Sequence, residues 1–401
     1  MRGWVRGLLL PLTLVSCTPV LAKSKGPGSE VVAGTFQTPT RLAQAQEVPK
    51  FVDDLDFTWL ETAVLRQLAR FEKKHLTGFI YYGQDKYPLS RVVESLELLS
   101  DLARQYKTCL SVDSKIECQT RFHQQVIGGF NIYVPHLAPK DPRYEEKETT
   151  FFTGYYTPLI KVTDRPHPDY PHAIHSRPPK GAFSKATRVE IDFDHVLRNS
   201  GTEMFFAKDL FDLYIMHVEG GGKVEVQGGG GKESYYLSYD GTNKQSFRFI
   251  SRYMMEKGYI QDRSNASQHQ FLLENPDKQR EIYEYCPSYV FFKITSTPPL
   301  GSDGVPLTDN RSIATDSDLY RFKGGLAFVS SYRPEEGQGE AEERANTIKY
   351  RPYSRFVLDQ DTGGAIKGKS RVDLYWGEGD YASFAAHNSS HFGNIFWLIK
   401  K

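Results

Sequence analysis

The sequence predicts a mostly β protein that begins with two helices. Beyond Phe151, short runs of β-branched and aromatic residues alternate with Gly, Pro, Asn and Asp, a pattern typical of many short strands joined by turns. Before that point, two segments carry apolar residues at helical spacing. The first contains Val64, Leu68 and Phe71, and the second contains Val93, Leu96, Leu99 and Ala103 after a candidate N-cap at Ser90.

The remaining segments follow from composition and periodicity. Residues 23–50 are rich in Ser, Gly, Pro, Thr and Gln and predict a flexible linker, so that the folded part starts near Phe51. Apolar residues share one face of a predicted helix over 246–257, and residues 333–346 predict an exposed loop before a strand at 355–358. The 401 residues, 39% of them hydrophobic, can form a substantial core, which we expect to be divided between two domains.

The first 22 residues have the features of a signal peptide. Arg2 and Arg6 precede an apolar run at 7–15 that is too short to span a bilayer as a permanent helix. Cys17 ends a lipobox and would be acylated, whereas residues 20–22 offer an ordinary cleavage site, and both interpretations stay open. In either case we expect the mature protein outside the cytoplasm.

Composition limits the class of partner. The 50 Lys and Arg residues balance 49 Asp and Glu residues, and a net charge of +1 gives no field that would attract nucleic acid. Cys109 and Cys118 could form a short-loop disulfide or remain thiols, because spacing alone does not establish geometry. No pair of cysteines has the CxxC spacing of a zinc knuckle or a thioredoxin-like site.

A candidate acid lies near the C-terminus of the chain. Asp373 alternates with Tyr375 between apolar Val372 and Leu374, so that the carboxyl and the ring would share one strand face. Partial burial and neighbouring carboxylates at Asp361 and Asp380 would both disfavour its charged form, as a general acid requires. From the residues alone, a solvated turn acid is the competing interpretation.

Long motifs around this acid resemble those of a known family. Residues 361–368, Asp-Thr-Gly-Gly-Ala-Ile-Lys-Gly, and residues 372–380, Val-Asp-Leu-Tyr-Trp-Gly-Glu-Gly-Asp, are similar to the three-aspartate motif of the membrane-bound lytic murein transglycosylase A family. Further segments resemble that family in the same order, namely residues 152–158, 239–243, 287–292 and 304–316. Agreement of several long motifs in one order is far more specific than any single motif.

The resemblance implies a fold and a domain organisation. We expect a double-psi β-barrel domain, formed by residues 51–160 and 300–401 and including the three-aspartate motif. A second, smaller β-rich domain at 161–299 would be inserted into it, with a glycan groove between the two. The chain departs from the family at Glu219, where Gln is expected, and at the glycines of 227–231.

The resemblance also implies an activity and catalytic residues. The expected reaction cleaves the β-1,4 bond between N-acetylmuramic acid and N-acetylglucosamine in peptidoglycan and forms a 1,6-anhydro ring, as in a peptidoglycan lytic exotransglycosylase. Asp373 corresponds to the catalytic aspartate, acting as general acid and then as base, with Asp361, Asp380 and Lys367 in support. The alternatives are an inverting polysaccharide hydrolase, for which Asp361 would be the base, and a non-catalytic peptidoglycan-binding lipoprotein. The residues alone do not distinguish exo from endo action.

Several side chains are expected to bind the glycan. They are Thr153, Tyr155, Tyr156, Thr157, Tyr375, Ser312 and Asp316. The competing interpretation is core packing for the tyrosines and hydrogen bonds within the barrel for Ser312 and Asp316. Lys367 would orient Asp361, contact substrate or lie as a solvated turn lysine.

No cofactor or metal is expected. The run 228–233 resembles a phosphate loop, but Glu233 stands where a Ser or Thr would hold magnesium, and no acidic residue flanks His387 and His391 to complete a metal site. The expected partners are peptidoglycan glycan strands and, through a lipid anchor at Cys17, a membrane. We expect a monomer on the periplasmic face of the outer membrane, or alternatively a soluble periplasmic or secreted protein.

Overall fold

The computed structural model describes the chain except for residues 1–29, 137–149, 180, 182–184, 228–232 and 365. The predicted signal peptide, Cys17 and the glycine-rich run at 228–231 therefore lie outside the described residues.

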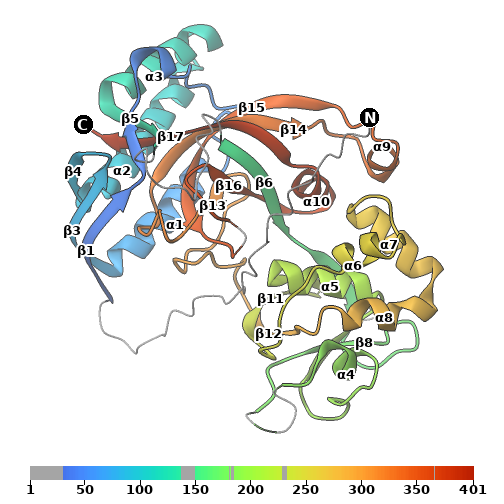
Figure 1. Ribbon diagram of the computed structural model, residues 1–401. Helices are drawn as coiled ribbons and strands as arrows, with labels where there is room; N and C mark the ends of the chain where they lie inside the picture. Colours follow the sequence, from blue (N-terminus) through green and yellow to red (C-terminus); the bar gives the residue numbers. More distant parts are fainter. Residues whose placement is uncertain (1–29, 137–149, 180, 182–184, 228–232, 365) are drawn as a thin grey trace, which may run out of the picture.

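The larger sheet closes on itself (Figure 1). Its strand order is β14-β15-β13-β16-β6-β17-β5-β2, and an additional pairing of β14 with β17 completes a ring of six strands. The strands are β2 (Thr40–Leu42), β5 (Phe130–Pro135), β6 (Thr150–Thr157), β13 (Ser312–Ala314), β14 (Leu326–Pro334), β15 (Tyr350–Asp361), β16 (Arg371–Glu378) and β17 (Ser390–Lys400). The predicted mostly β class is confirmed, while the double-psi connectivity stays a prediction.

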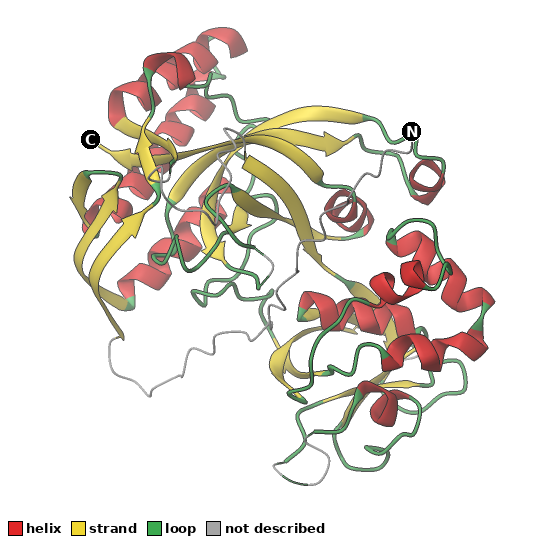
Figure 2. Cartoon of the chain, in the orientation of Figure 1, coloured by secondary structure: helices red, strands yellow, loops and turns green. Residues whose placement is uncertain are grey.

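A second sheet of six strands has the order β12-β11-β10-β7-β9-β8. Its strands are β7 (Leu159–Thr163), β8 (His172–His175), β9 (Glu203–Ala207), β10 (Gly221–Val226), β11 (Glu233–Thr242) and β12 (Val290–Thr295). Its helices are α4 (Arg188–Asp192), α5 (Leu210–Glu219), α6 (Ile250–Glu256), α7 (Asn265–Glu274) and α8 (Gln279–Glu284), with a 3₁₀ turn at Pro276–Lys278. Figure 2 shows these elements as a separate group, which the chain enters directly after β6.

The N-terminal part packs against the outside of the barrel. It consists of β1 (Glu30–Thr38), a 3₁₀ turn (Ala45–Glu47), α1 (Leu60–Glu72), β3 (Lys74–Tyr82), β4 (Asp85–Pro88), α2 (Ser90–Cys109) and α3 (Lys115–Gly129). Cys109 and Cys118 form a disulfide that joins α2 to α3, which decides the open question of their pairing. No helix among the described residues is long and apolar enough to cross a membrane.

Three sequence-based boundaries need correction. The predicted linker at 23–50 contains β1, which pairs in parallel with β3, and β2, which pairs with β5, because its β-branched residues add to edges formed by distant strands. Ser90 is the first residue of α2 rather than its N-cap, which is Leu89. The segment 333–346, predicted as a loop, contains a short helix, α9 (Glu340–Arg344).

A buried ion pair fastens the N-terminal segment to the barrel. The Arg311 guanidinium donates to both carboxylate oxygens of Asp53, at 2.6 and 2.9 Å, and neither side chain has any exposed surface. Arg311 also donates to the carbonyl oxygens of Thr58 and Phe356, at 2.8 and 2.9 Å. Because every oxygen of the pair has a donor, the cost of taking both charges out of water is offset by these contacts.

Loss of this pair should destabilise the whole fold. We expect Asp53→Asn to lower the free energy of unfolding by about 3 kcal/mol or more, because the Arg311 charge would remain buried without its counterion. Urea denaturation followed by circular dichroism measures the change. The control is Lys115→Gln, which removes an exposed pair with Asp56 and should cost less than about 1 kcal/mol. Equal losses in the two variants would contradict the proposed importance of the buried pair.

Candidate active site

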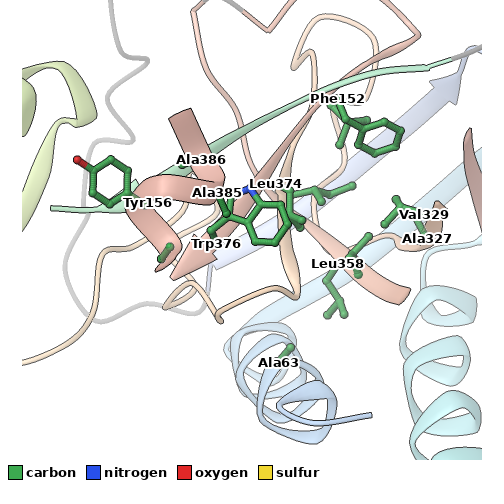
Figure 3. Packing of buried hydrophobic residues seen from close by; sticks show 14 of the residues in the cluster. Ala63, Phe152, Tyr156, Ala327, Val329, Leu358, Leu374, Trp376, Ala385 and Ala386 are labelled. Atoms are coloured by element: carbon green, nitrogen blue, oxygen red, sulfur yellow. The ribbon is translucent and has the colours of Figure 1, made fainter. Parts of the chain in front are cut away.

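The pairing of β6 with β16 determines which side chains meet. The two strands are parallel, with Thr153 opposite Asp373 and Tyr155 opposite Tyr375. Phe152, which directly precedes Thr153, points into the hydrophobic core, as does Leu374 on β16 (Figure 3). Since side chains alternate along a strand, Thr153, Tyr155 and Asp373 lie on the opposite side of the sheet from that core.

Asp373 is held by one direct hydrogen bond. The Thr153 hydroxyl donates to Oδ1 of Asp373 at 2.6 Å. The pKa of Asp373 is raised to about 6, and burial is the largest cause. The charge of Asp361 also raises this pKa, whereas the Thr153 hydrogen bond and the charge of Arg371 lower it. A carboxyl with this pKa can exist in both protonation states near neutral pH, as a group that first gives and then takes a proton requires.

Asp361, the last residue of β15, is held by three donors. Its Oδ1 accepts from the backbone N–H groups of Ser302 at 2.9 Å and Thr362 at 2.8 Å. Its Oδ2 accepts from the Tyr155 hydroxyl at 3.0 Å. Burial raises the pKa of Asp361, and the three donors lower it. Asp361 therefore positions Tyr155 and acts on Asp373 through its charge.

The predicted tyrosines divide between the two sides of β6. The rings of Tyr155 and Tyr375 lie 5.2 Å apart between centroids, and the Tyr375 hydroxyl forms a hydrogen bond with that of Thr157. Tyr375 and Thr157 are almost fully buried, so the Tyr375 ring, held by Thr157, gives Tyr155 a fixed surface to pack against. Tyr156 points to the other side, where its ring meets the edge of His387 at 5.1 Å and lines a cavity of about 690 Å³.

Two of the predicted supporting residues do not adjoin Asp373. Asp380 is exposed at the start of α10 (Asp380–His387) and lines the cavity beside Tyr156, whereas the charges acting on Asp373 are those of Arg371 and Asp361. Lys367 pairs with Asp318 at 2.9 Å and Asp316 at 3.4 Å instead of orienting Asp361. Its side chain remains almost half exposed.

Ser312 and Asp316 hold the barrel together in place of the predicted contact with glycan. Ser312 has no exposed surface; its hydroxyl donates to Oε1 of Gln360 at 2.6 Å and accepts from the Thr308 N–H at 2.8 Å. Asp316 is equally buried and accepts from the Gly368 N–H at 2.7 Å. Both side chains accept from backbone N–H groups in loops that precede β13 and β16, and their burial leaves them no surface for a glycan in this conformation.

Two residues without a predicted role adjoin Asp373. Burial and the charge of Asp373 together raise the pKa of Glu219, the last residue of α5, to about 8. Arg371 lies two positions before Asp373 on β16, and its charge lowers the pKa of Asp373. The alternation of side chains along a strand could have placed Arg371 beside Asp373, but nothing local in the sequence links Glu219 to Asp373, because Glu219 ends helix α5.

The described residues contain two groups with metal-ligating atoms close together. Cys109, Asp113 and Cys118 form one, but its thiols are joined in the disulfide. Asp209, Asp212 and His269 form the other, in which Asp209 already caps α5 through Oδ1 and meets Nε2 of His269 at 3.0 Å through Oδ2. Neither group lies among the residues described around Asp373, and the expectation of a metal-free reaction stays a prediction.

These features define a β-barrel protein with a candidate acid–base site on the side of its sheet that faces away from the core. Residues 151–293 match the family model of the MltA specific insert domain, and residues 311–399 match that of the 3D domain. The predicted resemblance is confirmed: the chain carries both domains and is similar to membrane-bound lytic murein transglycosylase A.

Named relatives and solved structures agree with this assignment. The chain is 29% identical over 258 residues to membrane-bound lytic murein transglycosylase A of Vibrio cholerae, covering 63% of this chain and 66% of that protein. It is 28% identical over 253 residues to the Escherichia coli protein of that name, covering 62% and 65%. The alignments thus span slightly less than two thirds of each relative.

The solved structures show the shared fold. Escherichia coli MltA with bound chitohexaose matches with a TM-score of 0.65 at 21% identity, covering 91% of this chain and 95% of that one. A membrane-bound lytic murein transglycosylase from Agrobacterium tumefaciens matches with a TM-score of 0.63 at 20% identity, covering 90% and 97%.

The contacts of Asp373 predict opposite pKa changes in two variants. Thr153→Val removes a donor that stabilises the carboxylate and should move the pKa above about 6, whereas Asp361→Asn removes a like charge and should move it below about 6. Titration of the labelled Asp373 carboxyl by ¹³C NMR measures both. Thr163→Val, which alters a threonine on β7, is the control and should leave the pKa unchanged. Shifts in the same direction would contradict the assigned interactions.

Proposed function

We propose that this protein is a lytic transglycosylase of peptidoglycan. It cleaves the β-1,4 bond between N-acetylmuramic acid and N-acetylglucosamine and leaves a 1,6-anhydro ring on the muramic acid. The two matched domains and the names of the relatives support this substrate and reaction. The observation that carries the proposal is the Asp373 carboxyl, with a pKa near 6, on the side of the sheet away from the core.

The proposed mechanism uses one carboxyl twice. Protonated Asp373 gives its proton to the glycosidic oxygen as the bond to C1 breaks. The resulting carboxylate then takes the proton of the C6 hydroxyl of the same sugar while that oxygen attacks C1, so no water enters the reaction. The Thr153 hydroxyl stabilises the carboxylate between the two steps and fixes its orientation. The Asp361 charge favours reprotonation, because it raises the pKa of Asp373.

The surroundings of Asp361 argue against an inverting hydrolase. Such an enzyme needs a second carboxylate free to activate a water on the far face of the sugar. Both oxygens of Asp361 are occupied by the donors Ser302, Thr362 and Tyr155. Three donors already use most of the acceptor sites of this carboxylate, which leaves little capacity to bind and orient a water.

The same proposal includes the domains and the location of the protein. We propose a barrel domain of residues 51–160 and 300–401 with an inserted domain at 161–299, since β7 to β12 form a sheet of their own. We also propose an envelope protein attached to a membrane through acylated Cys17. The disulfide between Cys109 and Cys118 supports an oxidising compartment outside the cytoplasm.

Replacement of the acid should abolish the reaction without unfolding the protein. We expect Asp373→Asn to reduce cleavage of purified murein by about 10²-fold or more, because an amide cannot give and retake a proton. Mass analysis of the products identifies the reaction, since anhydro ends are lighter by one water than hydrolysed ends. Asp164→Asn, at an exposed acid, is the control. Hydrolysed ends from the wild-type protein would favour the hydrolase, and full activity of Asp373→Asn would exclude Asp373 as the acid.

The proposed anchor can be tested separately. A radiolabelled fatty acid should enter the protein expressed in a bacterial host that processes lipoproteins, and Cys17→Ala should remove the label. The mature N-terminus should then be Cys17. A mature protein that begins at Lys23 and carries no label would instead support soluble export.

A further inference from the structure

Arg371 lies beside the acid on the same side of the sheet. Because it precedes Asp373 by two positions on β16, the two side chains project in the same direction. In the parallel register Arg371 pairs with Phe151, and its guanidinium carbon lies 4.9 Å from the centre of the Phe151 ring. The guanidinium therefore lies against the face of the Phe151 ring, two residues along β16 from Asp373.

This guanidinium has no hydrogen-bonded or ion-paired partner among the described residues; its neighbours there are the Phe151 ring and, through its charge, Asp373. It makes no hydrogen bond or ion pair in that part of the chain, and its Nη1 atom is buried. Other buried arginines differ: Arg311 is paired with Asp53, and Arg355 is paired with Asp54 at 2.8 Å. An arginine keeps its charge when buried, and an unsatisfied buried donor costs free energy. Among the residues that the structure describes, none is ion-paired with Arg371, which is thus available there for an anion.

A pair of aromatic rings extends from Arg371 across the neighbouring strand. The antiparallel pairing of β17 with β6 places Phe392 opposite Phe151, and the two rings lie 5.1 Å apart between centroids. The Phe392 side chain is 49% exposed. Exposed aromatic faces suit the apolar faces of sugar rings. A phenylalanine packed in the core would not remain half exposed.

We propose that Arg371, Phe151 and Phe392 form a subsite for an acidic unit of the glycan, in which Arg371 binds a carboxylate and the two rings pack against the saccharide. The inference rests on the proposed function and adds a determinant of specificity to it. A planar guanidinium binds a carboxylate through two parallel hydrogen bonds. The wall polymer offers such groups in two places, the lactyl ether of N-acetylmuramic acid and the peptide attached to it.

An effect of Arg371 on the acid alone does not account for these features. The Arg371 charge lowers the pKa of Asp373, which makes the carboxyl a poorer proton donor at neutral pH. A residue selected only to tune the acid would oppose the first step of the reaction. Binding of an anionic substrate unit gives the guanidinium a partner and explains why it lies next to the acid.

Binding measurements in the Asp373→Asn background test the proposal, because this background removes any effect through the acid's charge. Isothermal titration calorimetry should compare neutral chitohexaose with peptide-free murein hexasaccharides whose lactyl carboxylates are free. We expect Arg371→Gln to weaken binding of the acidic glycan by about tenfold or more and to change that of chitohexaose by less than about twofold. Arg321→Gln, at an arginine whose Nε donates to a nearby backbone oxygen, is the control and should affect neither ligand.

Two further measurements identify the anion and the aromatic contact. Conversion of the lactyl carboxylates to methyl amides should remove the effect of Arg371→Gln if the lactyl group is bound, whereas an effect seen only with peptide-bearing glycan would assign the peptide carboxylate. Phe392→Ala should weaken acidic and neutral glycans alike by several-fold, with Phe249→Ala at another exposed phenylalanine as control.

The outcomes separate this inference from the proposed function. Equal losses for neutral and acidic glycans in Arg371→Gln, or no loss for either, would overturn the subsite while leaving the transglycosylase proposal intact. Failure of the folded Asp373→Asn protein to bind any glycan would overturn both. Thermal unfolding of each variant shows whether the fold is retained, and Arg371→Lys, which keeps the charge without the planar fork, should restore part of the affinity for the acidic glycan.

Discussion

The register between β6 and β16 is the constraint on which the site depends. The two strands are separated by more than 200 residues, yet their pairing places Thr153 against Asp373 with a hydrogen bond of 2.6 Å. A slip by one residue would turn Asp373 into the core and Leu374 out of it. Burial of Phe152 and Leu374 therefore fixes the position of the acid, so that hydrophobic packing on one side of the sheet determines polar chemistry on the other.

Close packing behind β6 makes this register rigid. At Gly154, which lies between Thr153 and Tyr155, a Cβ atom would come within 2.3 Å of the Trp376 indole nitrogen and 2.9 Å of the Ala386 backbone. Only glycine lets the strand approach these neighbours so closely. β6 is therefore packed tightly against β16 and α10 at the point where Thr153 and Tyr155 project. Barrel closure through β17, which pairs with both β14 and β6, completes the support.

The sequence could locate the acid because the information for it is local. Alternation around Asp373 and the long motifs identify the strand and its polar side, and both survive in the structure. The sequence does not define the roles of Lys367 and Asp316, because a lysine or an aspartate in a loop has the same local sequence whether it binds substrate or pairs within the protein. Glu219 could not be placed beside Asp373 at all, because it ends helix α5, which is distant from β16 in sequence. The strand β1 likewise depends on an edge that β3 provides.

The charges around Asp373 connect substrate binding to its protonation. At neutral pH a Glu219 carboxyl with a pKa of about 8 is mostly neutral, which leaves Arg371 and Asp361 as the charges that act on the acid. In the free protein Arg371 favours the carboxylate form of Asp373. A substrate carboxylate bound to Arg371 would cancel that influence, while the sugar would exclude water, and both changes raise the pKa of Asp373. In the proposed subsite, an acidic glycan thus favours the protonated form of Asp373 in both ways, whereas a neutral glycan does so only by excluding water.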